Sequence, residues 1–301
     1  MIRVLIAGGT GFIGRHLAKG IVDSGGEVTL LTRSSASNGQ YKQISWRDHS
    51  EVRALAKEIE NYDLIVNLSG ASIDKRWSES YKEEIIKSRV DSTAMLVRAI
   101  NSAVTKPKYF VNASAVGYYG DLDDGTADED SGPGNDFLAS LCIKWEDEAR
   151  KLDKNVKLLI PRFGVVMGKD GGAFAQLIRG ARNGISFDTK GKSAWKSWIH
   201  VEDAVYSIIF MTSKGFEGVY NAVSPSPLKM EGMMQLIANQ IGRKARVKVG
   251  PRATGILLGE GGRYSVFSSQ KVLPKRLLEL GFQFKYPDFL DALSDLLKVD
   301  K

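Results

Sequence analysis

The chain opens with Ile2-Arg3-Val4-Leu5-Ile6-Ala7-Gly8-Gly9-Thr10-Gly11-Phe12-Ile13-Gly14. An apolar, β-branched run enters a glycine-rich turn, and a helical pattern follows, because Ile13, Leu17 and Ile21 recur at four-residue spacing. A strand, a glycine turn and a helix in this order are typical of a dinucleotide-binding site. Glycines let the backbone approach a pyrophosphate, whose charge then lies at the helix N-terminus.

The glycine turn fits two templates. Gly9, Gly11 and Gly14 match G-x-G-x-x-G, whereas Gly8, Gly11 and Gly14 match G-x-x-G-x-x-G. The alternative interpretation is an ordinary tight turn between a strand and a helix. The flanking strand and helix patterns favour a nucleotide cofactor over that alternative.

Composition limits the class of protein. The chain has 301 residues, of which 43% are hydrophobic and 26% charged, as in ordinary globular proteins. The single cysteine, Cys142, excludes an intrachain disulfide and fits a reducing compartment. No apolar run approaches the length of a membrane span, and no secretory leader precedes the first strand. We therefore expect a cytoplasmic protein without a membrane partner.

The net charge of +7 is consistent with binding of nucleic acid, with binding of anionic small molecules, or with solubility alone. Two basic clusters contribute to this charge; they consist of Arg179, Arg182, Lys190, Lys192 and Lys196, and of Arg243, Lys244, Arg246, Lys248 and Arg252. No nucleic-acid motif or aromatic stacking pattern accompanies them. We expect solvated surface or a pocket for a phosphorylated substrate, and no nucleic-acid partner.

Strand and helix patterns alternate in the first half of the chain, which predicts a parallel sheet covered on both faces. The expected strands span residues 28–31, 43–45, 63–68, 109–112, 156–160 and 218–222. The expected helices span residues 52–59, 79–103, 136–151, 204–212, 229–241, 274–280 and 287–298. The predicted fold class is α/β, a Rossmann-type doubly wound parallel sheet with a smaller C-terminal substrate domain. We place the nucleotide-binding domain at residues 1–166 plus about 198–223, and the smaller domain at 167–197 plus 224–301.

The end of the second expected strand indicates which nicotinamide cofactor binds. In Rossmann folds that bind NAD, an acidic residue at this position forms a hydrogen bond with the ribose 2′-hydroxyl. Here the sequence reads Thr32-Arg33-Ser34. An arginine with two hydroxyls attracts a 2′-phosphate, so NADP is favoured over NAD. The alternative is that Arg33 is an exposed loop charge.

Several motifs give the chain a resemblance to a known superfamily. They include Asn67-Leu-Ser-Gly-Ala71, Ser114-Ala-Val-Gly-Tyr-Tyr-Gly120 and Trp198-Ile-His-Val-Glu-Asp203, besides the glycine turn. With them the chain resembles the short-chain dehydrogenase/reductases, and most of all the extended branch that contains nucleotide-sugar epimerases. Over its whole length it is similar to an atypical group of epimerase-family, or sugar-nucleotide epimerase-like, proteins. Further residues that carry this likeness are Arg76-Trp77, Ser88-Arg89, Asp136-Phe-Leu-Ala139, Trp145-Glu146, Tyr220-Asn-Ala222, Leu258-Gly-Glu260, Leu273-Pro274 and Gly281-Phe282.

The resemblance implies positions for the cofactor contacts. The pyrophosphate would be held by Gly8, Gly9, Thr10, Gly11, Phe12, Ile13 and Gly14. Thr32 and Arg33 would hold the 2′-phosphate, with Ser34 beside them. Leu68, Ser69 and Gly70 would lie along the adenosine. Glu84 and Arg89 fall where this group reaches the dinucleotide; the alternative is a solvated pair on one helix.

The acid–base pair of the superfamily is missing. Extended dehydrogenases use a serine and a Tyr-x-x-x-Lys pair, in which the lysine lowers the tyrosine pKa from the same helical face. No tyrosine here is followed by lysine four places on, and alignment on Glu146 puts the two positions at Leu138 and Cys142. A lone helical cysteine is usually a small buried hydrophobe.

Three hydroxyl groups remain as catalytic candidates. Ser114 lies where the resemblance puts the active-site serine, and Tyr118 and Tyr119 follow it; the alternative is that the tyrosines pack the loop. His200 is expected to anchor a turn rather than act as a base. The three histidines and one cysteine are scattered, so no metal site is predicted.

Two functions remain open. The first is an NADP-dependent oxidoreductase or epimerase-like enzyme for a small, anionic substrate such as a nucleotide sugar, with Ser114 and Tyr118 or Tyr119 polarising a carbonyl. The second is an NADP(H)-binding sensor that reports to a partner, because binding survives the loss of the tyrosine–lysine pair. The resemblance also implies a homodimer through the helices at 79–103 and 136–151.

Overall fold

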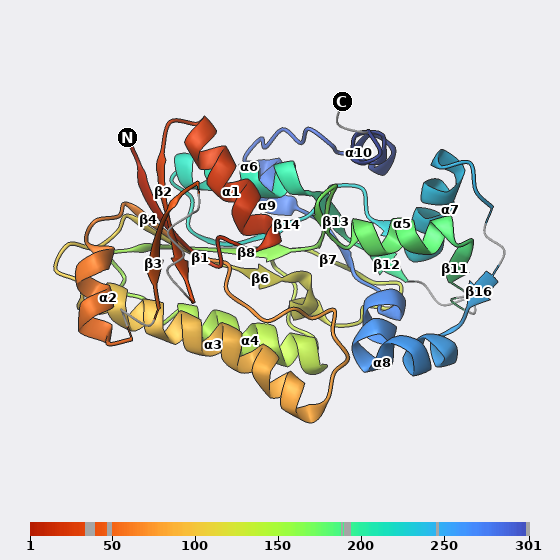
Figure 1. Cartoon of the computed structure of the whole chain (residues 1–301), viewed down its shortest axis with the longest axis horizontal. Helices are drawn as coiled ribbons and strands as arrows, with labels where there is room; N and C mark the ends of the chain where they lie inside the picture. Colours follow the sequence, from red (N-terminus) through yellow and green to blue (C-terminus); the bar gives the residue numbers. More distant parts are fainter. Residues whose placement is uncertain (34–39, 47–49, 188, 190–193, 245–246, 299–301) are drawn as a thin grey trace.

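A computed structural model describes residues 1–33, 40–46, 50–187, 189, 194–244 and 247–298. Its main sheet is parallel throughout, in the order β3-β2-β1-β4-β5-β8-β14 (Figure 1). The strands of this path are β1 (Arg3–Ala7), β2 (Glu27–Thr32), β3 (Lys42–Ser45), β4 (Leu64–Asn67), β5 (Tyr109–Asn112), β8 (Lys157–Phe163) and β14 (Gly218–Ala222). The short β6 (Ser114–Ala115) also pairs with β8. The predicted Rossmann-type α/β sheet is confirmed.

Helices cover both faces of this sheet (Figure 1). One face carries α1 (Phe12–Asp23) and α6 (Val201–Ser213); the other carries α2 (Val52–Ile59), α3 (Glu79–Ser102) and α4 (Phe137–Ala149). Alternate residues of β1 point to opposite faces, so Val4 packs with Leu17 of α1, whereas Leu5 packs with Leu96 of α3. Because both faces are buried, the strands are apolar almost throughout.

Most of the remaining elements surround a second core at the opposite end of the molecule from β3 (Figure 1). Its helices are α5 (Phe174–Arg182), α7 (Met230–Gln240), α8 (Pro251–Phe267) and α10 (Phe289–Leu296). Short strands accompany these helices and pair with one another. The pairs are β9 (Val165–Gly168) with β10 (Gly171–Gly172) and with β13 (Trp198–His200), β11 (Ile185–Phe187) with β16 (Val247–Val249), and β12 (Trp195–Lys196) with β15 (Leu228–Lys229). The division into two domains at the expected residues stays a prediction.

Two segments link this second part to the main sheet. The strands β7 (Thr126–Ala127) and β17 (Lys271–Val272) pair in parallel. The helix α9 (Lys275–Glu279) packs on β14, and Leu277 belongs to the core of the main sheet. This part of the C-terminal segment therefore stabilises the sheet.

The glycine-rich passages differ from expectation. The helices α5 and α8 were not predicted, and α8 bends at Gly259, whose φ is +72°. The helices expected near residues 229–241, 274–280 and 287–298 are present as α7, α9 and α10. Within the described residues, no helix has both the length and the apolar character needed to span a membrane.

Candidate functional site

The turn between β1 and α1 needs its glycines for steric reasons. Gly8 has a φ of +77°, and a Cβ there would lie 2.7 Å from the Leu68 carbonyl carbon. A Cβ at Gly9 would lie 2.4 Å from Leu30 Cδ2, and one at Gly14 would lie 2.5 Å from Gly8 O. Non-bonded atoms do not come this close to a Cβ. Gly8 and Gly14 meet backbone atoms, so the turn requires glycine at these two positions, whereas the neighbour of Gly9 is the end of a flexible side chain.

The N-terminus of α1 is open to an anion. Its N-cap residue is Gly11, no side chain caps the helix, and its first turn contains no acidic residue. The N–H groups of a first helical turn lack partners within the helix and carry partial positive charge. The described turn from Gly8 to Gly14 is therefore a suitable site for a phosphate group.

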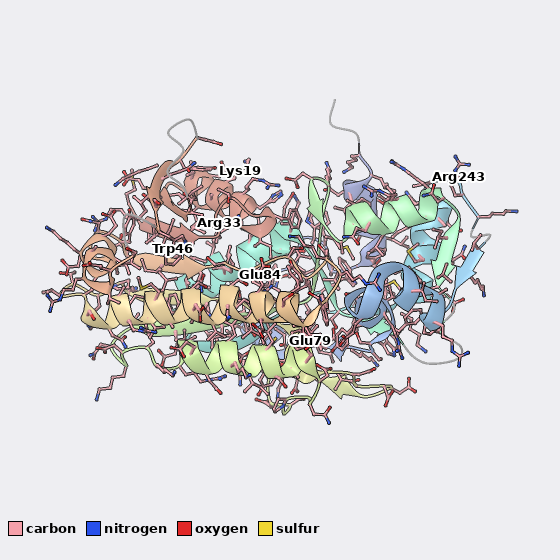
Figure 2. The ribbon with its side chains drawn as sticks, turned by 60° about the horizontal axis from the view of Figure 1, so that its bottom comes forward. Lys19, Arg33, Trp46, Glu79, Glu84 and Arg243 are labelled. Atoms are coloured by element: carbon pink, nitrogen blue, oxygen red, sulfur yellow. The ribbon has the colours of Figure 1, made fainter. Side chains whose placement is uncertain are left out.

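Arg33 lies directly after β2 and is exposed. Within the described part of the chain it forms no ion pair, so its charge is not neutralised by a carboxylate. The hydroxyl of Thr32 donates to the backbone oxygen of Ile44 at 3.4 Å. Figure 2 shows Arg33 in the same region as Trp46 and Lys19 of α1. Ser34, the third expected contact, lies outside the described residues.

The loop after β4 forms another side of the site. The backbone N–H of Leu68 donates to Ala7 O at 2.8 Å, and that of Ser69 donates to Asn67 Oδ1 at 3.1 Å. Gly70 lies against α3, because a Cβ there would be 2.9 Å from Arg89 Cζ. The loop thus contacts both β1 and α3.

Arg89 is a half-buried cation beside this loop. Its Nη1 donates to Ile85 O at 3.1 Å, and its guanidinium lies 5.4 Å from the centre of the Trp145 ring. Burial lowers its pKa, and no carboxylate pairs with it in the described ranges. Its other donors can therefore serve an anion next to Gly70.

Glu84 lies on the same helix but points to the surface. It helps to line a shallow hollow of about 430 Å³, with Ser80, Glu83, Lys87, Ser88 and Asp91. Of these side chains, Ser88 is tied to the loop, since its hydroxyl accepts from Ala71 N at 2.8 Å. Figure 2 shows Glu84 on the outside of α3. The structure thus brings Arg89 to the loop and leaves Glu84 on the surface.

Ser114 is part of a buried ionic network. Its hydroxyl donates to Glu146 Oε1 at 2.7 Å, and the residue is 2% exposed. The same carboxylate accepts from Arg162 Nε at 2.7 Å and Nη2 at 2.8 Å, and from Arg150 Nη2 at 2.7 Å. The Ser114 hydroxyl thus donates to Glu146 in this structure, and its expected role in polarising a carbonyl stays a prediction.

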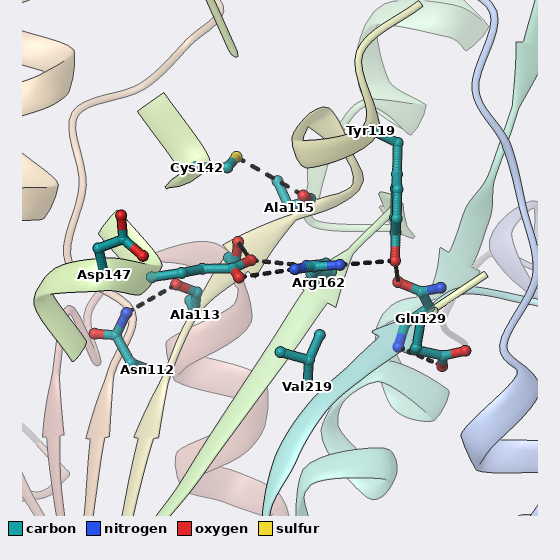
Figure 3. A network of polar contacts seen from close by, with 12 residues as sticks. Asn112, Ala113, Ala115, Tyr119, Glu129, Cys142, Asp147, Arg162 and Val219 are labelled. Carbon is teal, nitrogen blue, oxygen red and sulfur yellow. Dashed lines mark hydrogen bonds and ion pairs between the residues drawn. The ribbon is translucent and has the colours of Figure 1, made fainter. Parts of the chain in front are cut away.

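Tyr119 belongs to this network as well. Its hydroxyl donates to Asn221 Oδ1 at 2.8 Å and accepts from Arg162 Nη1 at 2.9 Å, as Figure 3 shows for the arginine. Burial raises its pKa to about 12, and 2% of the residue is exposed. These contacts hold the Tyr119 hydroxyl in the core, and its expected role in catalysis stays a prediction.

Tyr118 is the expected candidate that keeps a free hydroxyl. Its ring lies under the Arg162 guanidinium, with 3.3 Å between the carbon of that group and the ring centre. The residue is half-buried, and its hydroxyl forms no hydrogen bond with any described residue. Of the three hydroxyls, Tyr118 is the one whose proton is available.

The positions of the missing acid–base pair are apolar. Leu138 packs on Gly117, where a Cβ would lie 3.2 Å from Leu138 Cβ. Cys142 is buried, its thiol approaches Ala115 O at 3.7 Å, and burial raises its pKa to about 12. Neither residue can supply the proton chemistry of a tyrosine–lysine pair.

His200 has a structural role, as expected. Its Nδ1 accepts from Glu202 N at 3.3 Å, which caps α6, and its ring lies 4.0 Å from that of Tyr286. Burial lowers its pKa to about 4, so the ring is neutral at pH 7. Its Nε2 is 3.6 Å from Asp295 Oδ2, which is too long for a hydrogen bond. No cluster of metal ligands occurs among the residues that the structure describes.

Lys196 was expected in a solvated basic cluster, but it is buried. It is 2% exposed, and its Nζ donates to Ser268 O at 2.6 Å. No carboxylate lies within ion-pair distance in the described part of the chain, although Asp121 is near enough to act on its charge. Burial lowers its pKa to about 7. The position of this lysine in a short strand, between two tryptophans, was the available signal in the sequence.

Comparisons with known proteins agree with this geometry. The profile of the NAD dependent epimerase/dehydratase family matches residues 4–222, and a domain of unknown function matches residues 253–296. A chloroplastic epimerase family protein SDR39U1 homologue of Arabidopsis thaliana is 37% identical, over 98% of this chain and 86% of its own length. An epimerase family protein of Staphylococcus saprophyticus is 34% identical, over 99% of this chain and 100% of its own length.

A solved structure is similar over almost the whole chain. It is that of the human epimerase family protein SDR39U1 with NADPH, which has a TM-score of 0.88 and 30% identity and covers 98% of this chain and 99% of that one. The family profile covers well over half of the 301 residues. This chain therefore belongs to the NAD dependent epimerase/dehydratase family.

Proposed function

We propose that this protein binds NADP(H), with the pyrophosphate on the glycine turn and the 2′-phosphate on Arg33. The observation that carries the proposal is Arg33, exposed at the end of β2 and without an ion pair among the described residues, at the position where NAD-specific folds have an acid. The human relative, whose structure contains NADPH, supports the same cofactor. Arg89 would add a second cation on the far side of the loop after β4.

Arg33→Asp is expected to weaken NADPH binding by about 10- to 100-fold, because a charge-assisted hydrogen bond is lost and a like charge is added. NADH has no 2′-phosphate, so its affinity should stay within about 3-fold of the unaltered value. Titration calorimetry with both nucleotides measures the two effects. Arg243→Asp makes the same charge change at the far end of the molecule in Figure 2 and serves as the control. Equal loss for NADPH and NADH would contradict the assignment.

We further propose an oxidoreductase of the epimerase-like type, acting on a small anionic substrate such as a nucleotide sugar. When bound, the nicotinamide would supply hydride chemistry. Tyr118 would donate a hydrogen bond to the substrate oxygen, since Ser114 and Tyr119 are committed to the Glu146–Arg162 network. The stacked Arg162 would hold the Tyr118 ring in place.

A second candidate is a non-catalytic NADP(H) sensor. It is favoured by Leu138 and Cys142, which fill the positions of the acid–base pair with apolar groups. Cofactor binding does not need that pair, whereas proton transfer does. Like the homodimer, a partner protein for the sensor is a proposal.

The cytoplasmic location is also a proposal; the Arabidopsis relative is named as chloroplastic.

Single-turnover absorbance of NADPH separates the two candidates. The protein is mixed with NADPH and a ketone or quinone, or with NADP⁺ and UDP-glucose, and 340 nm absorbance is followed. The enzyme proposal expects turnover that falls about 10- to 1000-fold in Tyr118→Phe, because one donor to the reacting oxygen is lost. Unchanged turnover in Tyr118→Phe contradicts its role. Tight NADPH binding without turnover across the panel favours the sensor.

A further inference from the structure

The β9–β10 hairpin is shaped around one side chain of the glycine turn. The ring of Phe12 lies against three hairpin glycines, Gly168, Gly171 and Gly172. A Cβ on any of these glycines would lie between 2.5 and 2.7 Å from an atom of the Phe12 ring. The hairpin therefore packs on the turn at van der Waals distance, and only glycine fits there.

An ionic cluster joins the same two elements. Asp170, at the tip of the hairpin, lies 2.8 Å from His16 Nε2 through Oδ1 and accepts from Arg15 Nη2 at 3.3 Å through Oδ2. Arg15 in turn donates from Nη1 to Thr10 O within the glycine turn, at 3.2 Å. The carboxylate thus orients a guanidinium that is bonded to the backbone of the turn.

The hairpin continues directly into the second core. Ala173, the N-cap residue of α5, donates its N–H to Val166 O at 3.4 Å. Met167 of β9 and Phe174 of α5 are both buried in that core. These contacts form one continuous packed path from the hairpin to α5.

We infer that the β9–β10 hairpin is a clasp that couples cofactor binding at the glycine turn to the ordering of α5, with Asp170 as its positioning residue. The inference rests on the proposed binding of NADP(H). A pyrophosphate bound at the N-terminus of α1 restricts the motion of the turn. The packing of Phe12 on the hairpin glycines and the Arg15–Asp170 contact then restrict the motion of the hairpin. Asp170 acts through Arg15 and His16 and touches no cofactor atom.

Hydrogen–deuterium exchange with and without NADPH tests the coupling. In the unaltered protein, NADPH is expected to slow exchange by about 5-fold or more both in α1 and in α5. In Asp170→Asn, the protection of α1 should persist, whereas the gain in α5 should fall, because only the packing of Phe12 then links the turn to the hairpin. Asp170→Glu keeps the charge and should restore part of the gain, which loss of packing alone would not predict. His16→Asn removes one contact of the same carboxylate and should act like Asp170→Asn.

Asp23→Asn is the matched control, because Asp23 pairs with Lys19 at the other end of α1. It should leave the protection of α5 unchanged. The inference is overturned if Asp170→Asn keeps the full gain in α5, or if NADPH protects α1 but not α5 in the unaltered protein. Absence of protection anywhere contradicts NADP(H) binding itself, and that result is distinct from a failed clasp.

Discussion

Glu146→Gln is expected to lower the free energy of unfolding by about 3–5 kcal/mol, the usual cost of breaking a buried ion pair. Glu146 is 0% exposed and Arg162 is 3% exposed, so neither charge is solvated by water once its partner is gone. Glutamine has one oxygen and one NH2 group, and the NH2 group cannot accept, so Arg162 would keep its contact with Tyr119 but lose one of its two hydrogen bonds to this side chain. Urea unfolding followed by circular dichroism measures the change.

Asp147→Asn provides the control on the same helix. Asp147 pairs with Arg150 at the surface, and 62% of its side chain is exposed. Exposed pairs contribute about 0–1 kcal/mol, so this variant should unfold almost like the unaltered protein. Combining Glu146→Gln with Arg162→Met should cost less than the sum of the two single changes, because the charges are removed together. A loss below about 1 kcal/mol for Glu146→Gln would show that the network is solvated.

The parts of the fold and site that are local in sequence could be predicted. The turn from Gly8 to Gly14 combines strand, turn and helix signals within one short stretch, and the sterics of Gly8 and Gly14 agree with that interpretation. The parallel sheet follows from the alternation of strand and helix patterns. The position of Arg33 at the end of β2 was predictable for the same reason, whereas its contact with a 2′-phosphate stays a prediction.

Contacts between distant segments could not be read from the sequence. Ser114 comes from the short strand β6, Glu146 from α4 and Arg162 from β8, and only the folded sheet brings them together. Position within a motif predicted a catalytic Ser114, whereas its partner Glu146 holds the hydroxyl in the core. A useful signal was available, because an arginine inside the apolar run of β8 requires a buried partner.

The helix α8 was not predicted because its segment contains several glycines. Glycine lowers helix propensity by about 1 kcal/mol per residue, so a segment with several glycines is not expected to be helical. Here Gly259 is the bend, and a Cβ there would lie 2.8 Å from Arg76 Cγ. Gly261 lies against Trp77, at 2.5 Å from a Cβ to the indole. Packing on the loop after β4 therefore decides the structure of this segment over propensity.

Lys196→Met is expected to raise the free energy of unfolding at pH 6 by about 2–4 kcal/mol. Burial lowers the pKa of Lys196 from 10.5 to about 7, so holding this group charged in the fold costs stability below pH 7. A lowering of this size corresponds to about 5 kcal/mol. The gain should be smaller, because methionine leaves Ser268 O without the donor that now bonds it at 2.6 Å.

The pH dependence gives the sign of the effect. Between pH 7 and 10.5, the unfolded chain keeps the proton on Lys196 and the folded chain releases it, so stability rises with pH in this window. In Lys196→Met that rise should be absent, and the advantage of the variant should vanish near pH 10. Urea unfolding at pH 6, 8 and 10 checks both points, with Lys229→Met on the paired strand β15 as an exposed control. If the variant is less stable than the unaltered protein at every pH, the free-energy cost of leaving Ser268 O without a donor exceeds the gain from removing the buried charge.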